Sequence, residues 1–309
     1  VQTCALPISQ HGKEEQQDDQ PGQHAERKGA QAAAPFTPEP LLPADMLVLQ
    51  KIRVGADKEG NLAWLNLSTG QVVSRVTVGR EPHEVAVSTD GKYALTTNTG
   101  ANTNPGNTLS LIDLKTRKEL KRIDLGPLKS PHGVWYQGGR FFFTVETSKA
   151  IGAYDPVADK LVWVIGTGQD TTHNLVVSKD GKMIFTANRG SASVTMMELT
   201  GPDPDAYGAW KITLIPTCRG PQGLDLSPDG KEMWAGCRTD NQVAVVNTVE
   251  RKVVETFSVG SGALARVRFT PDGKRVLLAD LGKGELTIWD AATRTELKRF
   301  KLGSYAEGI

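Results

Sequence analysis

The sequence has almost no excess of charge, few aromatic residues and little cysteine. Its 36 Lys and Arg residues against 35 Asp and Glu residues give a net charge of +1, which argues against a large basic surface for duplex nucleic acid or an anionic membrane. No apolar run approaches the roughly 18 residues of a membrane-spanning helix. Three cysteines in 309 residues do not make a disulfide framework. Nucleophile-elbow, phosphate-loop and haem-attachment motifs are also missing, so no catalytic residue is assigned.

The first 45 residues have no hydrophobic periodicity. Residues 10–34 are rich in Gln, Glu, Asp, Lys and Ala, and four prolines follow between positions 35 and 43. Such a segment buries too little apolar surface to offset the entropy of ordering it. We therefore expect residues 1–45 to be a disordered, Pro-rich N-terminal segment. The opening run is too short for a secretory signal and lacks its basic flank.

Residues 46–309 repeat one pattern six times, the last copy incomplete. Each copy has a short apolar strand, a tight turn, a second strand, a polar loop and two further strands. The turn reads Asp-Gly-Lys in four copies, at Asp90, Asp180, Asp229 and Asp272. Asp-Gly between alternating apolar runs is a strong hairpin signal, because the turn needs positive φ.

The repeat length predicts the fold. His83 has equivalents at positions 132, 173, 222, 265 and 307, at intervals of 41 to 49 residues. A period near 45 with four short strands is typical of β-propeller blades. We therefore predict an all-β fold with a single β-propeller over residues 46–309 and about six blades in this chain. Residues 46–79 supply three strands of the first blade, and the last blade is incomplete. Closure of a six-bladed ring by Glu307–Ile309 is the alternative.

Several short motifs resemble a known repeat family. Leu95–Asn98 and Phe185–Asn188 end second strands and resemble the Tyr-Val-Thr-Asn signature of the YVTN-repeat, or YncE-like, β-propeller family. The Pro-Asp-Gly-Lys turns fit this family too, as does Pro-His or Pro-Gln before the first strands. The resemblance spans residues 46–309 and implies seven blades in the full-length protein, so that this chain is C-terminally truncated. It also implies export to the periplasm or the cell exterior.

Two columns of side chains are expected to surround one mouth of the ring. Strand direction alternates, so the start of each first strand and the end of each second strand lie at the same end of the blade. The candidate ligand-binding residues are His83, His132 and His173 from the first column, Asn98, Glu146, Asn188 and Asp280 from the second, and the neighbouring Arg80, Arg189, Arg219 and Arg238.

Three interpretations of this mouth stay open. Imidazoles with Glu146 or Asp280 are ligands for a divalent metal, although sheet spacing places the histidines roughly 10 Å or more apart. Arg and His donors also suit an anionic or polar small molecule or a peptide end. In the structural interpretation, the His rings bond to backbone of the neighbouring blade, and Asn and Asp satisfy loop amides. No cofactor is assigned.

The expected function is non-enzymatic: a binding or scaffold protein of the bacterial cell envelope that takes a small molecule, peptide or protein at the mouth and is monomeric when complete. One alternative is a lactonase-like hydrolase using a metal with Glu146 and Asn188. Another, implied by the resemblance, is weak binding of single-stranded nucleic acid through the arginines. Cys218 and Cys237 fall near the same mouth, either as a disulfide of an oxidising compartment or as two buried thiols.

Overall fold

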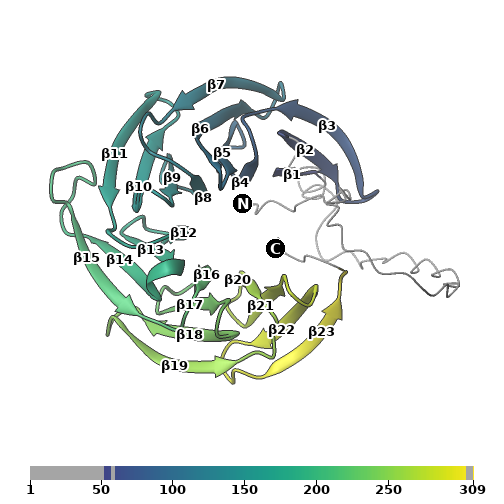
Figure 1. Ribbon diagram of the computed structural model, residues 1–309, viewed down its shortest axis with the longest axis vertical. Helices are drawn as coiled ribbons and strands as arrows, with labels where there is room; N and C mark the ends of the chain where they lie inside the picture. The colour runs from purple at the N-terminus through teal and green to yellow at the C-terminus, as the bar shows by residue number, and fades with distance from the viewer. Residues whose placement is uncertain (1–51, 57–59, 304–308) are drawn as a thin grey trace, which may run out of the picture.

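A computed structural model describes residues 52–56, 60–303 and 309 of the chain. It confirms the all-β fold, because six antiparallel sheets follow one another around a central axis as the blades of a β-propeller (Figure 1). The predicted N-terminal segment 1–45 and the predicted column residue Glu307 lie outside the described residues. Within the described ranges, no helix is long and apolar enough to cross a membrane.

The first sheet has three strands in the described part of the chain, as predicted for residues 46–79. They are hydrogen-bonded in the order β1 (Ile52–Ala56), β2 (Asn61–Asn66) and β3 (Gln71–Thr77).

The other five sheets have four strands each, paired in chain order. The innermost strands are β4 (Pro82–Val87), β8 (Pro131–Gln137), β12 (Thr172–Val177), β16 (Pro221–Leu226) and β20 (Leu264–Phe269). The second strands are β5 (Tyr93–Ala101), β9 (Arg140–Val145), β13 (Met183–Asn188), β17 (Glu232–Cys237) and β21 (Arg275–Asp280). The third strands are β6 (Asn104–Asp113), β10 (Ala150–Asp155), β14 (Ser193–Leu199), β18 (Gln242–Asn247) and β22 (Glu285–Asp290). The outer strands are β7 (Lys118–Asp124), β11 (Lys160–Gly166), β15 (Trp210–Pro216), β19 (Lys252–Ser258) and β23 (Glu296–Lys301).

The Asp-Gly turns join the two innermost strands of four blades, which confirms the predicted hairpins. In the first of them, Asp90 Oδ1 accepts a hydrogen bond from Ser88 Oγ at 2.7 Å and one from the Lys92 backbone N–H at 3.1 Å. Gly91 has a φ of +68°, which a residue without Cβ adopts at no steric cost. The same side-chain contacts recur around Asp180, Asp229 and Asp272.

The core lies between adjacent blades. Middle strands such as β17 are buried along most of their length, whereas outer strands such as β3 alternate between half-buried and exposed residues, as expected of sheets covered on both faces at the centre and solvated at the rim. Trp234 of β17 is fully buried and packs edge-on against Phe269 of the next blade, with ring centroids 5.4 Å apart. Such packing fixes the inner strands that carry the candidate site.

Candidate functional site

Each inner strand enters the channel with a similar local backbone geometry. The residue before the strand has positive φ in four blades, at Glu81, Ser130, Thr171 and Gly220. The pairing register then shifts within the first residues of all five inner strands. A register shift of this kind takes a residue out of the ladder and re-aims its side chain. The first predicted column, at the second residue of each inner strand, lies at this irregularity.

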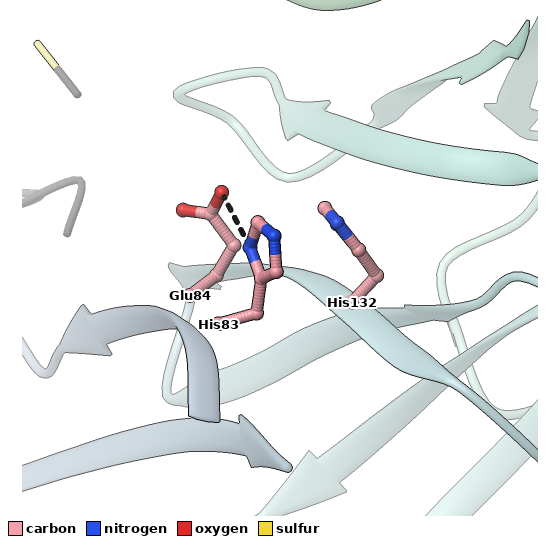
Figure 2. A group of neighbouring side chains, drawn as sticks. All are labelled: His83, Glu84 and His132. Atoms are coloured by element: carbon pink, nitrogen blue, oxygen red, sulfur yellow. Dashed lines mark ion pairs between the residues drawn. The ribbon is translucent and has the colours of Figure 1, made fainter. Parts of the chain in front are cut away.

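The three histidines of this column converge in the channel. The ring centroids of His83 and His132 are 4.0 Å apart, and those of His132 and His173 are 3.9 Å apart. Figure 2 shows the first two rings side by side. The expected separation of 10 Å or more is therefore wrong. It used the spacing of sheets packed face to face, whereas the inner strands of a propeller converge toward its axis.

A glycine next to the column allows this close approach. Gly133 follows His132 in β8, and a Cβ at this position would lie 2.9 Å from the His173 carbonyl oxygen and 2.8 Å from Asn174 Oδ1. Protein interiors are too densely packed to absorb such a contact without movement. The missing side chain at Gly133 therefore lets β8 and β12 approach until the two rings are in contact.

We expect Gly133→Ala to separate these strands and to lower the free energy of unfolding by about 2 kcal/mol, the ordinary cost of overpacking a filled interior. Urea denaturation measures the effect. Gly166→Ala in β11 is the matched control, because a Cβ there meets no atom within 4 Å. Equal stability of the two variants would contradict the proposed role of Gly133.

The main chain at two of the histidines is held by threonines of the preceding blade. Thr97 Oγ1 donates to the His132 carbonyl at 2.6 Å, and Thr144 Oγ1 donates to the His173 carbonyl at the same distance. These bonds position the two histidines without using their rings, so the structural interpretation does not account for the ring nitrogens.

The ring nitrogens of the histidines have few hydrogen-bond partners. His173 Nδ1 donates a short hydrogen bond to Glu146 Oε1, which leaves the lone pair on Nε2. His83 Nδ1, His132 Nδ1 and His173 Nε2 are all buried and have no hydrogen-bond partner. Because buried polar atoms are nearly always paired, these three nitrogens indicate a ligand that completes the site.

The electrostatic environment keeps the two buried imidazoles neutral. Burial, followed by the nearby His173 and His83 rings, holds the pKa of His132 well below its usual value. Burial also lowers the pKa of His173, with further contributions from Arg189, Arg266, His83 and Arg238. Neutral imidazoles keep a lone pair for a ligand near pH 7.

A buried ion pair crosses the channel beside the histidines. Arg266 of β20 bonds to Glu84 of β4, and both residues are about 5% exposed or less. Burial alone would raise the pKa of Glu84, but Arg266 and His83 outweigh it and hold that pKa below its usual value. Neither residue is among the candidate ligand-binding residues predicted from the sequence, although Arg266 directly follows the first column, beside the predicted arginines. The available signal was their opposite charge at the same repeat position, directly after the column.

The four predicted arginines divide into two pairs. Arg189 and Arg238 lie near enough to His173 to depress its pKa. Arg80 bonds to the Asn104 carbonyl and Arg219 pairs with Asp240, both at exposed positions. The structure therefore brings one pair to the histidines and uses the other in local loop contacts.

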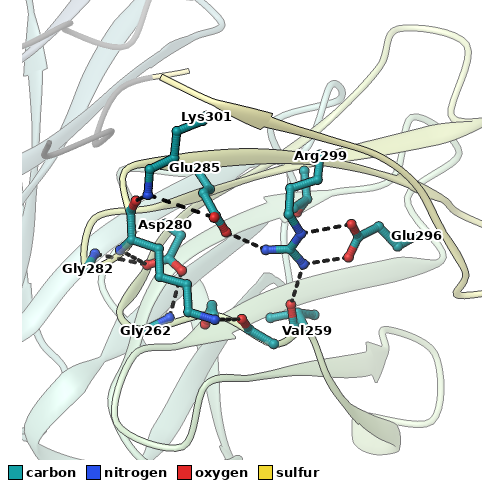
Figure 3. Close-up of polar contacts among 12 residues, drawn as sticks. Val259, Gly262, Asp280, Gly282, Glu285, Glu296, Arg299 and Lys301 are labelled. Atoms are coloured by element: carbon teal, nitrogen blue, oxygen red, sulfur yellow. Dashed lines mark hydrogen bonds and ion pairs between the residues drawn. The ribbon is translucent and has the colours of Figure 1, made fainter. Parts of the chain in front are cut away.

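The remaining second-column residues make internal hydrogen bonds, although Asn98 Oδ1 is buried without a partner. Asn98 donates to Thr108 and Ser110, and Asn188 bonds to hydroxyl groups on strands β12, β13 and β14. Asp280 accepts four backbone N–H bonds from the adjacent loops (Figure 3). Burial raises the pKa of Asp280, but these bonds outweigh it and leave the pKa below its usual value. Of this column, Glu146 is the residue that bonds to a histidine.

Cys218 and Cys237 form a disulfide, with Cα atoms 5.8 Å apart. It ties the end of β17 to the loop before β16 and lies directly next to Arg238 in the sequence. The pairing left open by the sequence analysis is thereby resolved.

In the described part of the chain, two groups of side chains have the composition and spacing of a metal site. The first is His83, Glu84 and His132, drawn in Figure 2, and the second is His132, Glu146 and His173. In each group the potential ligand atoms lie within 4.8 Å of one another. His132 belongs to both groups.

The opposite end of the propeller carries a separate hollow of about 460 Å³, which the sequence analysis did not predict. Asp-Gly turns line it together with Trp135, Met183, Asp225 and Arg268. Burial raises the pKa of Asp225, but its carboxylate accepts backbone N–H bonds from Leu226 and Phe269. The Asp225 carboxylate is therefore satisfied from within, whereas the indole Nε1 of Trp135 is buried without a hydrogen-bond partner.

No protein-family model and no curated protein matches the sequence of this chain.

Proposed function

We propose that this protein is a non-enzymatic binding module that holds a small anionic ligand at the histidine end of its channel. The observation that carries the proposal is the convergence of three imidazoles from three blades, with buried ring nitrogens that lack partners. A propeller fold is compatible with such a role, since small-molecule sites are concave and carry few, precisely placed polar groups.

Two arginines supply the positive charge for an anion. Within the described residues, the Arg189 guanidinium makes no ion pair and no hydrogen bond to another side chain, and Arg238 donates only to Gln222, at 3.2 Å. A guanidinium in this position binds carboxylate or phosphate oxygens through charge-assisted hydrogen bonds. The proposed ligand therefore carries such a group.

The proposal includes membership of the YVTN-repeat family and a place in the cell envelope. The repeated turns and the strand ends Leu95–Asn98 and Phe185–Asn188 support the family. The disulfide between Cys218 and Cys237 supports export, because disulfides persist in oxidising compartments.

Inorganic phosphate tests the ligand class. Isothermal titration of the protein with phosphate in the presence of EDTA is compared between wild type and the double variant Arg189→Gln and Arg238→Gln. We expect at least a tenfold loss of affinity, since a charge-assisted hydrogen bond contributes about 1.5–3 kcal/mol. The matched control is Arg80→Gln with Arg219→Gln, which removes the same charge elsewhere. Equal weakening by both pairs, or no effect of either, would overturn the proposal.

A further inference from the structure

We propose that His132, Glu146 and His173 bind a divalent first-row transition-metal ion in the channel. This inference rests on the proposed function, because it places a metal ion within the same ligand site. The ion would lie between β8 and β12.

The spacing of the donor atoms suits one ion. The potential ligand atoms of these three residues lie within 4.8 Å of one another. Two donors on opposite sides of an ion with bonds of about 2.1 Å are about 4.2 Å apart. Small side-chain rotations therefore bring all three donors to bonding distance, without any movement of the strands.

The hydrogen bond between His173 and Glu146 marks the position of the ion. His173 Nδ1 bonds to Glu146 Oε1, and a cation that replaces the proton between them would bond to both residues. Metal binding releases such protons, because the ligands must be deprotonated. His132 Nδ1 is buried and unpaired, so a bound cation would give this atom the partner that it lacks.

The inner group is a better site than the outer one. In the outer group, Glu84 is already neutralised by the buried Arg266, and the His83 side chain is 35% exposed. In the inner group, the His173 side chain is 5% exposed and Glu146 is 14% exposed. The inner carboxylate also has no arginine partner within the described residues, so its charge is available to a cation.

The donor set selects the class of metal. Two imidazoles and one carboxylate suit Zn²⁺, Cu²⁺ or Ni²⁺, whereas Ca²⁺ and Mg²⁺ prefer oxygen donors. Three protein ligands leave a coordination position for another group. Arg238 donates to Gln222, at the column position of the next blade, and Arg189 directly follows Asn188 of the second column, so both would attract an anion to that position. The anion would then offset the positive charge of the arginines, which would otherwise repel the metal ion.

Cu²⁺ is the probe for this site. Untagged protein is used, with His11→Gln and His24→Gln as the background, so that His83, His132 and His173 are its only histidines. Titration calorimetry measures the dissociation constant, and electron paramagnetic resonance counts coordinated nitrogen atoms. Each ligand is tested by replacement with Gln, which β16 already carries at the column position as Gln222.

We expect one bound ion with two coordinated ring nitrogens. His132→Gln and His173→Gln should each weaken binding by more than 100-fold, and Glu146→Gln by about 10–100-fold. Glu119→Gln, which removes a carboxylate from the outer strand β7, is the matched control and should leave the dissociation constant within about threefold. His83→Gln should weaken binding less than His132→Gln does. Circular dichroism melting verifies that each variant is folded.

Three results would overturn the assignment: absence of Cu²⁺ binding, unchanged binding in folded His132→Gln and His173→Gln variants, or a loss confined to His83→Gln and His132→Gln, which would place the ion in the outer group. Phosphate binding in EDTA is measured without metal, so a failure of the anion proposal and a failure of the metal site are distinguishable.

Discussion

Arg266→Met is expected to lower the free energy of unfolding by about 3–5 kcal/mol, the typical cost of breaking a buried ion pair. The substitution keeps most of the side-chain volume but leaves the Glu84 carboxylate buried without its guanidinium partner, with the His83 ring at 3.6 Å. Urea denaturation measures the change, since the unfolding free energy falls linearly with denaturant.

Two further variants separate charge from packing. Glu84→Leu combined with Arg266→Met removes both charges and should recover a large part of the lost stability, because an apolar pair has no charge to desolvate. Arg122→Met breaks the exposed pair with Glu119 and should cost less than about 1 kcal/mol. A loss for Arg266→Met as small as that for Arg122→Met would contradict the buried pair.

Removal of the disulfide is expected to have the second-largest effect. Cys218 and Cys237 are separated by 19 residues, and closing a loop of this length restricts the unfolded chain by about 3 kcal/mol. The double variant Cys218→Ser and Cys237→Ser should lose this amount in urea denaturation. Wild-type protein unfolded in the presence of reductant should show the same loss of unfolding free energy. Reductant should not change the unfolding free energy of the double variant.

A thiol count provides an independent check. The chain has three cysteines, so denatured protein without reductant should expose one reactive thiol, at Cys4, and all three after reduction. Three reactive thiols before reduction in protein purified from an oxidising compartment would contradict the pairing. It would also remove the support that the disulfide gives to an envelope location.

The blade architecture was predictable because each blade is a local unit. The Asp-Gly turns at Asp90, Asp180, Asp229 and Asp272 carry the hairpin signal within a few residues, and their regular recurrence sets the period. The position of the histidine column followed from the alternation of strand direction. The disulfide was one of the two states predicted for Cys218 and Cys237, because these cysteines bracket one hairpin.

The geometry of the site was less predictable because it depends on contacts between blades. The ring separation of His132 and His173 depends on Gly133 and on the register shifts in the inner strands, which no single repeat encodes. The pair Glu84 and Arg266 joins positions 182 residues apart. Sequence position alone also did not distinguish the role of Arg189 from that of Arg219. The ion pair between Arg219 and Asp240 forms only in the folded chain.

The most direct test of the binding site is nuclear magnetic resonance of protein labelled with ¹⁵N at histidine and tryptophan side chains, titrated with phosphate. The labels report on both ends of the propeller, because His132 and His173 lie in the channel cluster and Trp135 lines the hollow at the other end. The account predicts shifts of the His132 and His173 signals with the Trp135 indole unchanged. Shifts of the Trp135 indole with unchanged histidine signals would contradict it and place the ligand at the opposite end.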